Sequence, residues 1–218
     1  DDIDNPSTWF TRWTNGGDWT RINWDPHSST YSFTDSPPSG TTYRHDTFSV
    51  LEMTKIIDLR GAKMDDTPIM YFWDHYNIGD SDYARVQIAV QDQYEMTGTP
   101  PPPSVLTPTK RNRQGYDYLY DWGSDTSYGV SSSWQNVWSR GPYARVDTWG
   151  REQIDLSPYA DNPATPLVNE GKRIKIRFVL DALDVASGLR DGWFIDDIRI
   201  ELRSPLIHSL PFIDHAGA

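Results

Sequence analysis

The stretch Lys172-Arg-Ile-Lys-Ile-Arg-Phe-Val-Leu180 carries the clearest structural signal in the chain. Its apolar residues at positions 174, 176, 178 and 180 alternate with charged residues at 173, 175 and 177. Successive side chains of a β-strand point to opposite faces, so this pattern predicts a strand with one face in a core. The stretch from Gly192 to Leu202 predicts a further strand, the last in the chain.

Strand patterns recur along the rest of the chain, with turn residues between them. We expect strands within residues 43–59, 83–90 and 146–156, and in the aromatic segments 116–122 and 128–138. The nearly continuous apolar run from Pro68 to Tyr76 predicts a strand that is buried on both faces. Roughly nine or ten short strands and no amphipathic helix predict an all-β fold. We interpret it as a two-sheet antiparallel β-sandwich of jelly-roll type.

The composition points to the same class. Aliphatic residues are few, but 10 Trp, 12 Tyr and 7 Phe can supply an aromatic core. Asp accounts for 26 of the 31 acidic residues, and Asp favours turns whereas Glu favours helices.

Charge and residue types exclude several classes of partner and site. A net charge of −11 without a basic patch argues against binding to nucleic acid or to an anionic membrane. No apolar run approaches the roughly 20 residues of a transmembrane helix. The absence of Cys excludes disulfides and thiolate zinc sites. Because the chain begins without Met or a signal peptide, we expect it to be a piece of a longer precursor.

The length of 218 residues fits one main domain. We predict a single jelly-roll domain over residues 1–203, with a loop insertion at 92–115 that contains four consecutive prolines, Pro100 to Pro103. Residues 204–218 are weakly patterned and are predicted to form a C-terminal tail or linker.

Three groups of residues, taken in order, carry a family resemblance. The first joins Ser39–Tyr43 through Ile57-Asp-Leu59 to Pro68–Trp73, and the second is Asp82–Ile88. The third runs from Arg177–Asp181 to Asp191-Gly-Trp-Phe-Ile-Asp-Asp-Ile-Arg-Ile200. Together they resemble concanavalin A-like jelly-roll domains of the MAM type, especially those appended to bacterial immune-inhibitor-A-like metallopeptidases and surface proteins. The resemblance covers roughly residues 18–202; the MAM cysteines are missing and the Pro-rich insertion is additional.

This MAM-like resemblance implies a non-catalytic, extracellular or cell-surface module for adhesion or assembly within a larger surface or secreted protein. Its partners would be other protein subunits or neighbouring domains of the same precursor. The resemblance also implies a structural calcium ion near the chain ends. An early-loop Asp, for which Asp18 and Asp35 match best, and an Asp of the last strand would bind it.

The adjacent residues Asp196 and Asp197 lie in that last predicted strand. In a regular strand they face opposite sides, each among apolar neighbours, and an unpaired buried carboxylate is costly. Two interpretations stay open. Either the pair bonds to an Arg or to the backbone of an adjoining loop, or one member binds Ca²⁺ together with Asp18 and Asp35.

The tryptophans suggest an alternative function, a carbohydrate-binding accessory module of a secreted hydrolase. Six of them could stack on sugars or could instead fill the core: Trp9, Trp13, Trp122, Trp134, Trp138 and Trp149. The three in predicted loops, Trp9, Trp13 and Trp122, are the better ligand-binding candidates. A further alternative is a self-assembling filament or surface-layer subunit, in which residues 92–115 and 204–218 dock onto neighbouring copies.

Catalytic motifs are missing from the sequence. The five His form no His-Glu-x-x-His motif, and no Gly-x-Ser-x-Gly elbow occurs. The five Glu lack the spacing by which jelly-roll glycosidases place two carboxylates on one strand face. We therefore predict that the chain is not an enzyme.

Overall fold

A computed structural model describes residues 12–28, 30–36, 42–44, 46–59, 62, 67–91, 134–160, 172–183 and 190–202. The predicted insertion at 92–115, the aromatic segment 116–122 and the tail 204–218 lie outside these residues.

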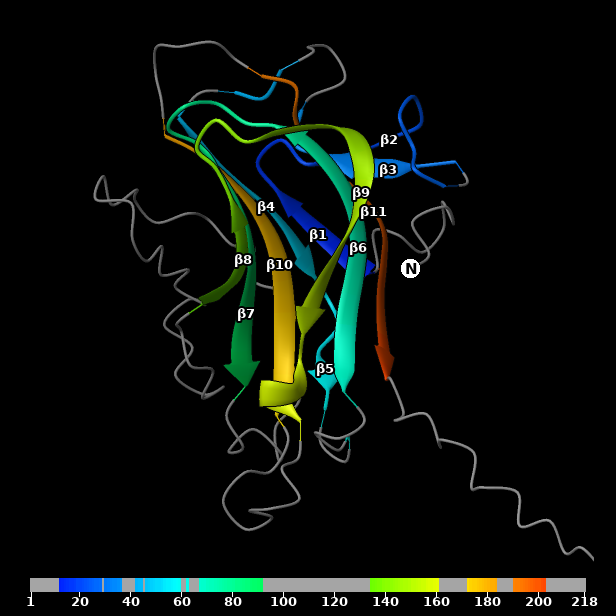
Figure 1. Cartoon of the computed structure of the whole chain (residues 1–218). Helices are drawn as coiled ribbons and strands as arrows, with labels where there is room; N and C mark the ends of the chain where they lie inside the picture. The colour runs from blue at the N-terminus through cyan, green and yellow to red at the C-terminus, as the bar shows by residue number, and fades with distance from the viewer. Residues whose placement is uncertain are drawn as a thin grey trace, which may run out of the picture.

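The described strands form two antiparallel sheets that face each other (Figure 1). The first sheet has the order β1 (Trp13–Gly16), β4 (Thr47–Met53), β10 (Arg173–Ala182), β7 (Tyr83–Gln91) and β8 (Gln135–Arg140), with β5 (Ile57–Asp58) also paired to β10. The second sheet has the order β2 (Thr20–Ile22), β3 (Ser32–Thr34), β11 (Gly192–Leu202), β6 (Pro68–Asn77) and β9 (Arg145–Asp155). The prediction of a two-sheet antiparallel β-sandwich is therefore confirmed.

Strand β10 shows why the alternating pattern was informative. Ile174, Ile176, Phe178 and Leu180 are all fully buried and belong to the core between the sheets. The core is aromatic, as the composition predicts. Trp193 stacks on Trp138 with ring centroids 5.3 Å apart and contacts Trp19 edge-on at 5.8 Å.

The charged side chains of β10 are buried or half-buried, although they lie on the outer face of the first sheet. Arg177 has no exposed surface; its Nε donates to Gln87 Oε1 at 2.7 Å, and its guanidinium lies 4.0 Å from the centre of the Trp134 ring. Lys175 Nζ lies 2.9 Å from Glu52 Oε1. The outer face of this sheet is therefore a layer of paired charges.

Strand β11 contains an irregularity that alternation alone does not reveal. Asp196 is opposite Trp73 and Arg199 is opposite Tyr71, so three steps along β11 match two steps along β6. One extra residue therefore forms a β-bulge, and Asp197 has a φ of 49° in the left-handed region. After the bulge the alternation is inverted: Ile195 before it and Ile198 after it both reach the core.

Within the described residues, no helix is long and apolar enough to cross a membrane.

Candidate functional site

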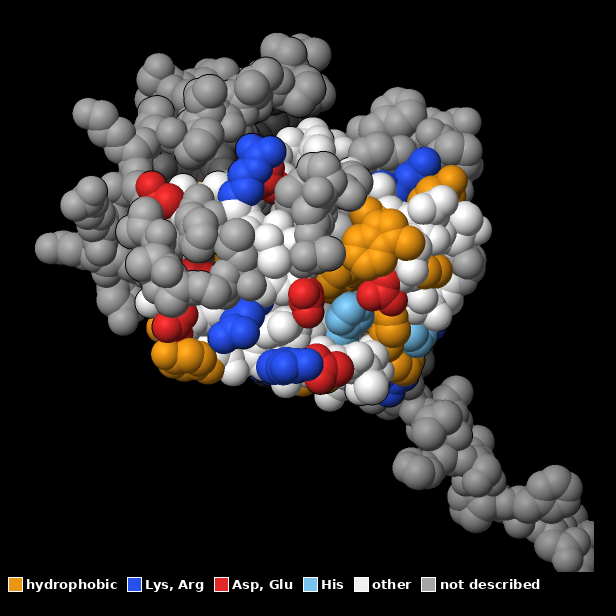
Figure 2. Space-filling view, turned by 90° about the horizontal axis from the view of Figure 1, so that it is seen from above, with side chains coloured by type: hydrophobic (Ala, Val, Ile, Leu, Met, Phe, Trp, Pro, Cys, Tyr) orange, Lys and Arg blue, Asp and Glu red, His pale blue; other side chains and the backbone are white. Residues whose placement is uncertain are grey.

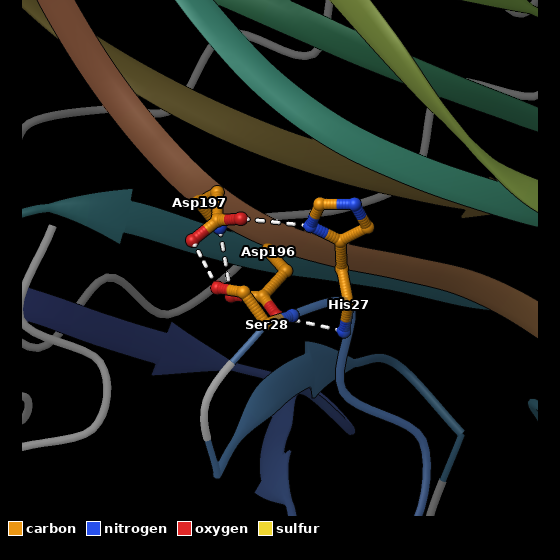
Figure 3. A network of polar contacts seen from close by, with 4 residues as sticks. All are labelled: His27, Ser28, Asp196 and Asp197. Atoms are coloured by element: carbon orange, nitrogen blue, oxygen red, sulfur yellow. Dashed lines mark hydrogen bonds and ion pairs between the residues drawn. The ribbon is translucent and has the colours of Figure 1, made fainter.

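The loop between β2 and β3 is fastened to strand β11 by two adjacent carboxylates (Figure 3). Asp196 Oδ2 accepts hydrogen bonds from the backbone N–H groups of His27 at 2.9 Å and Ser28 at 3.1 Å. Asp197 Oδ2 lies 2.8 Å from His27 Nδ1, and Asp197 Oδ1 accepts a bond of 2.6 Å from the Ser28 hydroxyl. The loop is thus fixed by bonds to both its backbone and its side chains.

The bulge explains why both carboxylates reach one loop. A regular strand would send Asp196 and Asp197 to opposite faces, as predicted from the sequence, and this prediction is wrong at the bulge. Burial raises the pKa of Asp196, while the N–H groups of Ser28, Asp197 and His27 act in the opposite direction. Of the two interpretations drawn from the sequence, bonding to the backbone of an adjoining loop is the one that the described contacts match.

This fixed loop completes a row of aromatic and imidazole rings, which we call the ring chain. The members come from the loop, β11, β6 and β9: Trp24, Phe194, His75, Trp149, His27 and Trp73. Centroid distances along the ring chain, in that order, are 5.5, 4.3, 4.6, 5.6 and 3.9 Å. Every ring therefore contacts the next one.

Exposure varies along the ring chain, and carboxylates lie beside its two imidazoles. Trp24 is 57% exposed, whereas Phe194 beneath it is buried. Carboxylates accompany both imidazoles: Asp25 Oδ2 lies 3.0 Å from His75 Nε2, and Asp197 bonds to His27. The side chains of Asp25 and Asp197 remain 37% and 36% exposed, so both can contact a ligand. Figure 2 shows histidine, hydrophobic and acidic side chains gathered on one side of the face in view.

Burial lowers the pKa of His75, although Asp25 and two further carboxylates act to raise it. A lowered pKa favours the neutral imidazole, so the ring, whose Nε2 lies 3.0 Å from Asp25 Oδ2, does not offset the charge of that carboxylate. The site thus offers an exposed indole beside a carboxylate.

Such a surface can bind a ligand through ring stacking and through hydrogen bonds. The face of an aromatic ring is electron-rich and attracts the C–H groups of a sugar or a positive charge. Carboxylate and imidazole atoms beside it can bond to hydroxyl or amino groups.

The tryptophans named from the sequence are distributed differently from what we predicted. Trp13 is only 3% exposed and contacts Phe33 and Phe178, each at 5.9 Å between ring centroids. The prediction of Trp13 as a loop ring for ligands is therefore wrong, because it begins β1 and faces the core. Trp9 and Trp122 lie outside the described residues.

Of the tryptophans in the ring chain, the sequence analysis predicted Trp149 as a candidate but not Trp24. Trp149 was among the six candidates and is half-buried in the ring chain. Trp24, the most exposed, was missed; its only sequence signal is its place in a turn-rich segment. Trp134 and Trp138 pack in the two buried clusters of the sandwich.

The four Asp residues predicted to bind calcium occupy two separate places. Asp35 is fully buried; its Oδ1 accepts a bond of 2.8 Å from Trp193 N–H, and its Oδ2 has no partner among the described residues. Asp196 lies three residues after Trp193 in β11, which at 3.3 Å per residue is about 10 Å along the strand from the backbone that Asp35 contacts. Asp18 lies near Asp35, because its negative charge acts to raise the pKa of Asp35. Asp18 also pairs with Arg44 at 3.4 Å.

Burial raises the pKa of Asp35 to about 8, and the negative charge of Asp18 contributes to the increase. The described residues contain no group of three His, Cys, Asp or Glu side chains that could hold a metal ion. Calcium binding therefore stays a prediction, and the oxygens of Asp196 and Asp197 are already engaged by N–H and O–H donors.

No family model matches the chain, so its MAM-like character also stays a prediction. No curated protein matches it either.

Several solved structures are similar in fold. A carbohydrate-binding module of the β-sandwich superfamily has a TM-score of 0.45 at 10% identity, with 89% of this chain and 59% of that chain covered. The N-terminal tandem CBM22 domain of Paenibacillus barcinonensis Xyn10C has a TM-score of 0.41 at 12% identity, with 90% and 48% covered. The mannan-recognising module TmCBM27 has a TM-score of 0.32 at 12% identity, with 89% and 90% covered. The chain thus spans about half to three fifths of the first two, and similarity this low specifies no ligand.

Proposed function

We propose that this domain is a non-catalytic carbohydrate-binding module, the alternative function suggested by the sequence. The observation that carries the proposal is the ring chain, with Trp24 exposed at one end and a carboxylate within 3.0 Å of each of its two imidazoles. The proposal rests on this site and not on the low-scoring structural neighbours.

The exposed ring is held in place, which is what a sugar-stacking platform requires. Trp24 contacts Phe194 edge-on at 5.5 Å, and the loop that carries it is fastened by Asp196 and Asp197. A ligand that binds to an already ordered surface loses less affinity to ordering of the protein.

The ring chain also extends across several strands. Its members lie on β11, β6 and β9, which are consecutive neighbours in the second sheet. At about 4.8 Å between neighbouring strands, the platform reaches about 10 Å across the sheet in addition to the loop.

Within this proposal the domain attaches a larger secreted or surface protein to a polysaccharide outside the cell. The adhesion or assembly role implied by the MAM-like resemblance remains compatible with it, because binding to a surface glycan is a form of adhesion.

Affinity electrophoresis and calorimetry of the complete chain with soluble xylan, mannan, β-glucan and amino-sugar oligomers test the proposal. We expect binding to at least one of them and a loss of at least about tenfold in Trp24→Ala. Leu202→Ala is a matched control, because Leu202 is 56% exposed at the far end of β11. Absence of binding to every glycan, or unchanged affinity in Trp24→Ala, would overturn the proposal.

We also propose calcium binding at Asp35, with Asp18 as a second carboxylate. The unpartnered buried Oδ2 of Asp35 and the nearby charge of Asp18 support it, because Ca²⁺ binds hard oxygen ligands and would offset their mutual repulsion. Asp196 and Asp197 do not fit this role, since donors already bond to their oxygens.

A further inference from the structure

We propose that the Trp24 end of the ring chain selects sugars that carry protonated amines, as in glucosamine polymers. This inference rests on the proposed function and names the chemical class of its ligand.

The first argument is the arrangement of an acid beside an exposed indole. Asp25 follows Trp24 in the loop, and its Oδ2 lies 3.0 Å from Nε2 of His75, which stacks on Phe194 under the Trp24 ring. Asp25 Oδ1 accepts no hydrogen bond within the described residues, and the side chain is 37% exposed. The Asp25 carboxylate thus contacts His75 through one oxygen and is partly exposed beside Trp24.

The second argument is the sign of the electrostatic field at His75, in the middle of the ring chain. The charges that act on this ring are those of Asp25, Asp147 and Asp191, all three negative. Asp191 is further oriented by Asn77, whose amide donates to it at 3.1 Å.

Each of the arginines on the same sheet face has a partner of its own. Arg145 lies 2.6 Å from Asp147, and Arg199 lies 3.2 Å from Glu201. Arg151 lies over Tyr71, beyond the Trp73 end of the ring chain. Arg145 offsets the charge of Asp147, so the acid that a ligand at Trp24 meets beside the aromatic face is Asp25, the next residue in the loop.

This combination discriminates among sugars. A protonated amine gains both a cation–π contact with the indole and a charge-assisted hydrogen bond with Asp25. A neutral hydroxylated or N-acetylated sugar gains only stacking and ordinary hydrogen bonds. A uronic-acid polymer is repelled by the same carboxylates and by the net charge of −11.

The test compares fully deacetylated glucosamine hexamer, its N-acetylated form, cellohexaose and oligogalacturonate by calorimetry at about 150 mM salt, where long-range charge effects are screened. We expect the glucosamine hexamer to bind at least about tenfold more tightly than the N-acetylated one. Asp25→Asn should remove that difference, while its melting temperature stays close to that of the wild type.

Asp58→Asn is the matched control, since Asp58 is 44% exposed in the first sheet and its loss changes the net charge equally. Equal affinity for both hexamers overturns the inference, as does an equal loss in Asp58→Asn, which would indicate unspecific attraction of a polycation. If neutral oligosaccharides bind through Trp24 without amine preference, the proposed function stands and the amine selectivity fails. If no sugar binds, the proposed function itself fails.

Discussion

The imidazole of His27 lies flat on the indole of Trp73, with ring centroids 3.9 Å apart and planes within 16° of parallel. The stack joins a loop residue to the middle of strand β6, and the carboxylates of β11 hold the loop in this position. The ring chain therefore depends on bonds formed by Asp196 and Asp197 as much as on its own rings.

Removal of the Asp196 carboxylate should loosen this loop. In Asp196→Ala three backbone N–H groups, those of His27, Ser28 and Asp197, lose their acceptor. Because such donors are costly when left without a partner, we expect the free energy of unfolding to fall by about 2–3 kcal/mol. Urea denaturation monitored by Trp fluorescence measures this fall in the free energy of unfolding. Asp155→Ala is the control, since Asp155 accepts one N–H, from Ser157, at an exposed position. An equal loss in both variants would contradict the prediction.

The buried Asp74 should make stability depend on pH. Burial raises its pKa from 3.8 to about 7, aided by the charge of Glu152, while the Trp193 indole N–H, at 3.0 Å, and Arg140 act to lower it. A raised folded-state pKa means that stability is fully present below about pH 4 and is lost as the pH rises through about 7.

Asp74→Asn removes this titration while its side-chain carbonyl can still accept the indole bond. We expect the variant to gain about 2–4 kcal/mol over the wild type between pH 4.5 and pH 8.5. Urea denaturation across this range, with Asp58→Asn as the exposed control, measures the gain. A constant difference between variant and wild type at every pH would show that Asp74 does not titrate in this way.

Calcium should raise the melting temperature through Asp35. Melting of the protein in EDTA and in excess Ca²⁺ should give different midpoints, since a ligand at 100 times its Kd stabilises by about 2.7 kcal/mol. Asp35→Asn should abolish the difference and Asp196→Asn should retain it, because Asp35, unlike Asp196, has a buried oxygen with no hydrogen-bond partner among the described residues. Identical midpoints in the wild type, or loss of the response in Asp196→Asn alone, would contradict the site.

Replacement of the buried Trp13 and replacement of the exposed Trp24 should change the free energy of unfolding by very different amounts. Trp13→Ala empties a position between Phe33 and Phe178, and we expect a loss of about 3–5 kcal/mol. Trp24→Ala, at a 57% exposed position, should cost about 0.5 kcal/mol. Equilibrium denaturation of both variants measures the contrast, and similar losses would refute the assignment of Trp13 to the core.

Much of the fold could be predicted because strand alternation is a local property. The runs at 68–76 and 172–180 correspond to β6 and β10, and Gly192 to Leu202 has the bounds of β11. The short strands β1 to β3 gave no clear pattern, since three or four residues are too few to establish a period.

The candidate site was harder to predict, and the bulge shows why. The sequence identified Asp196 and Asp197 as residues that need partners, but the extra residue at that point decides which way they point. Nothing in the local composition marks a bulge, because it arises from pairing with β6, more than 100 residues earlier in the chain.

The sequence by itself determined the class of fold and the aromatic nature of the core, both of which follow from composition and period. Only the tertiary structure decided which tryptophans are exposed and which rings touch. Trp24 and Phe194 meet because β11 pairs with β3, next to the loop. Contacts between residues so far apart depend on strand register, and register is set by the packing of both sheets together.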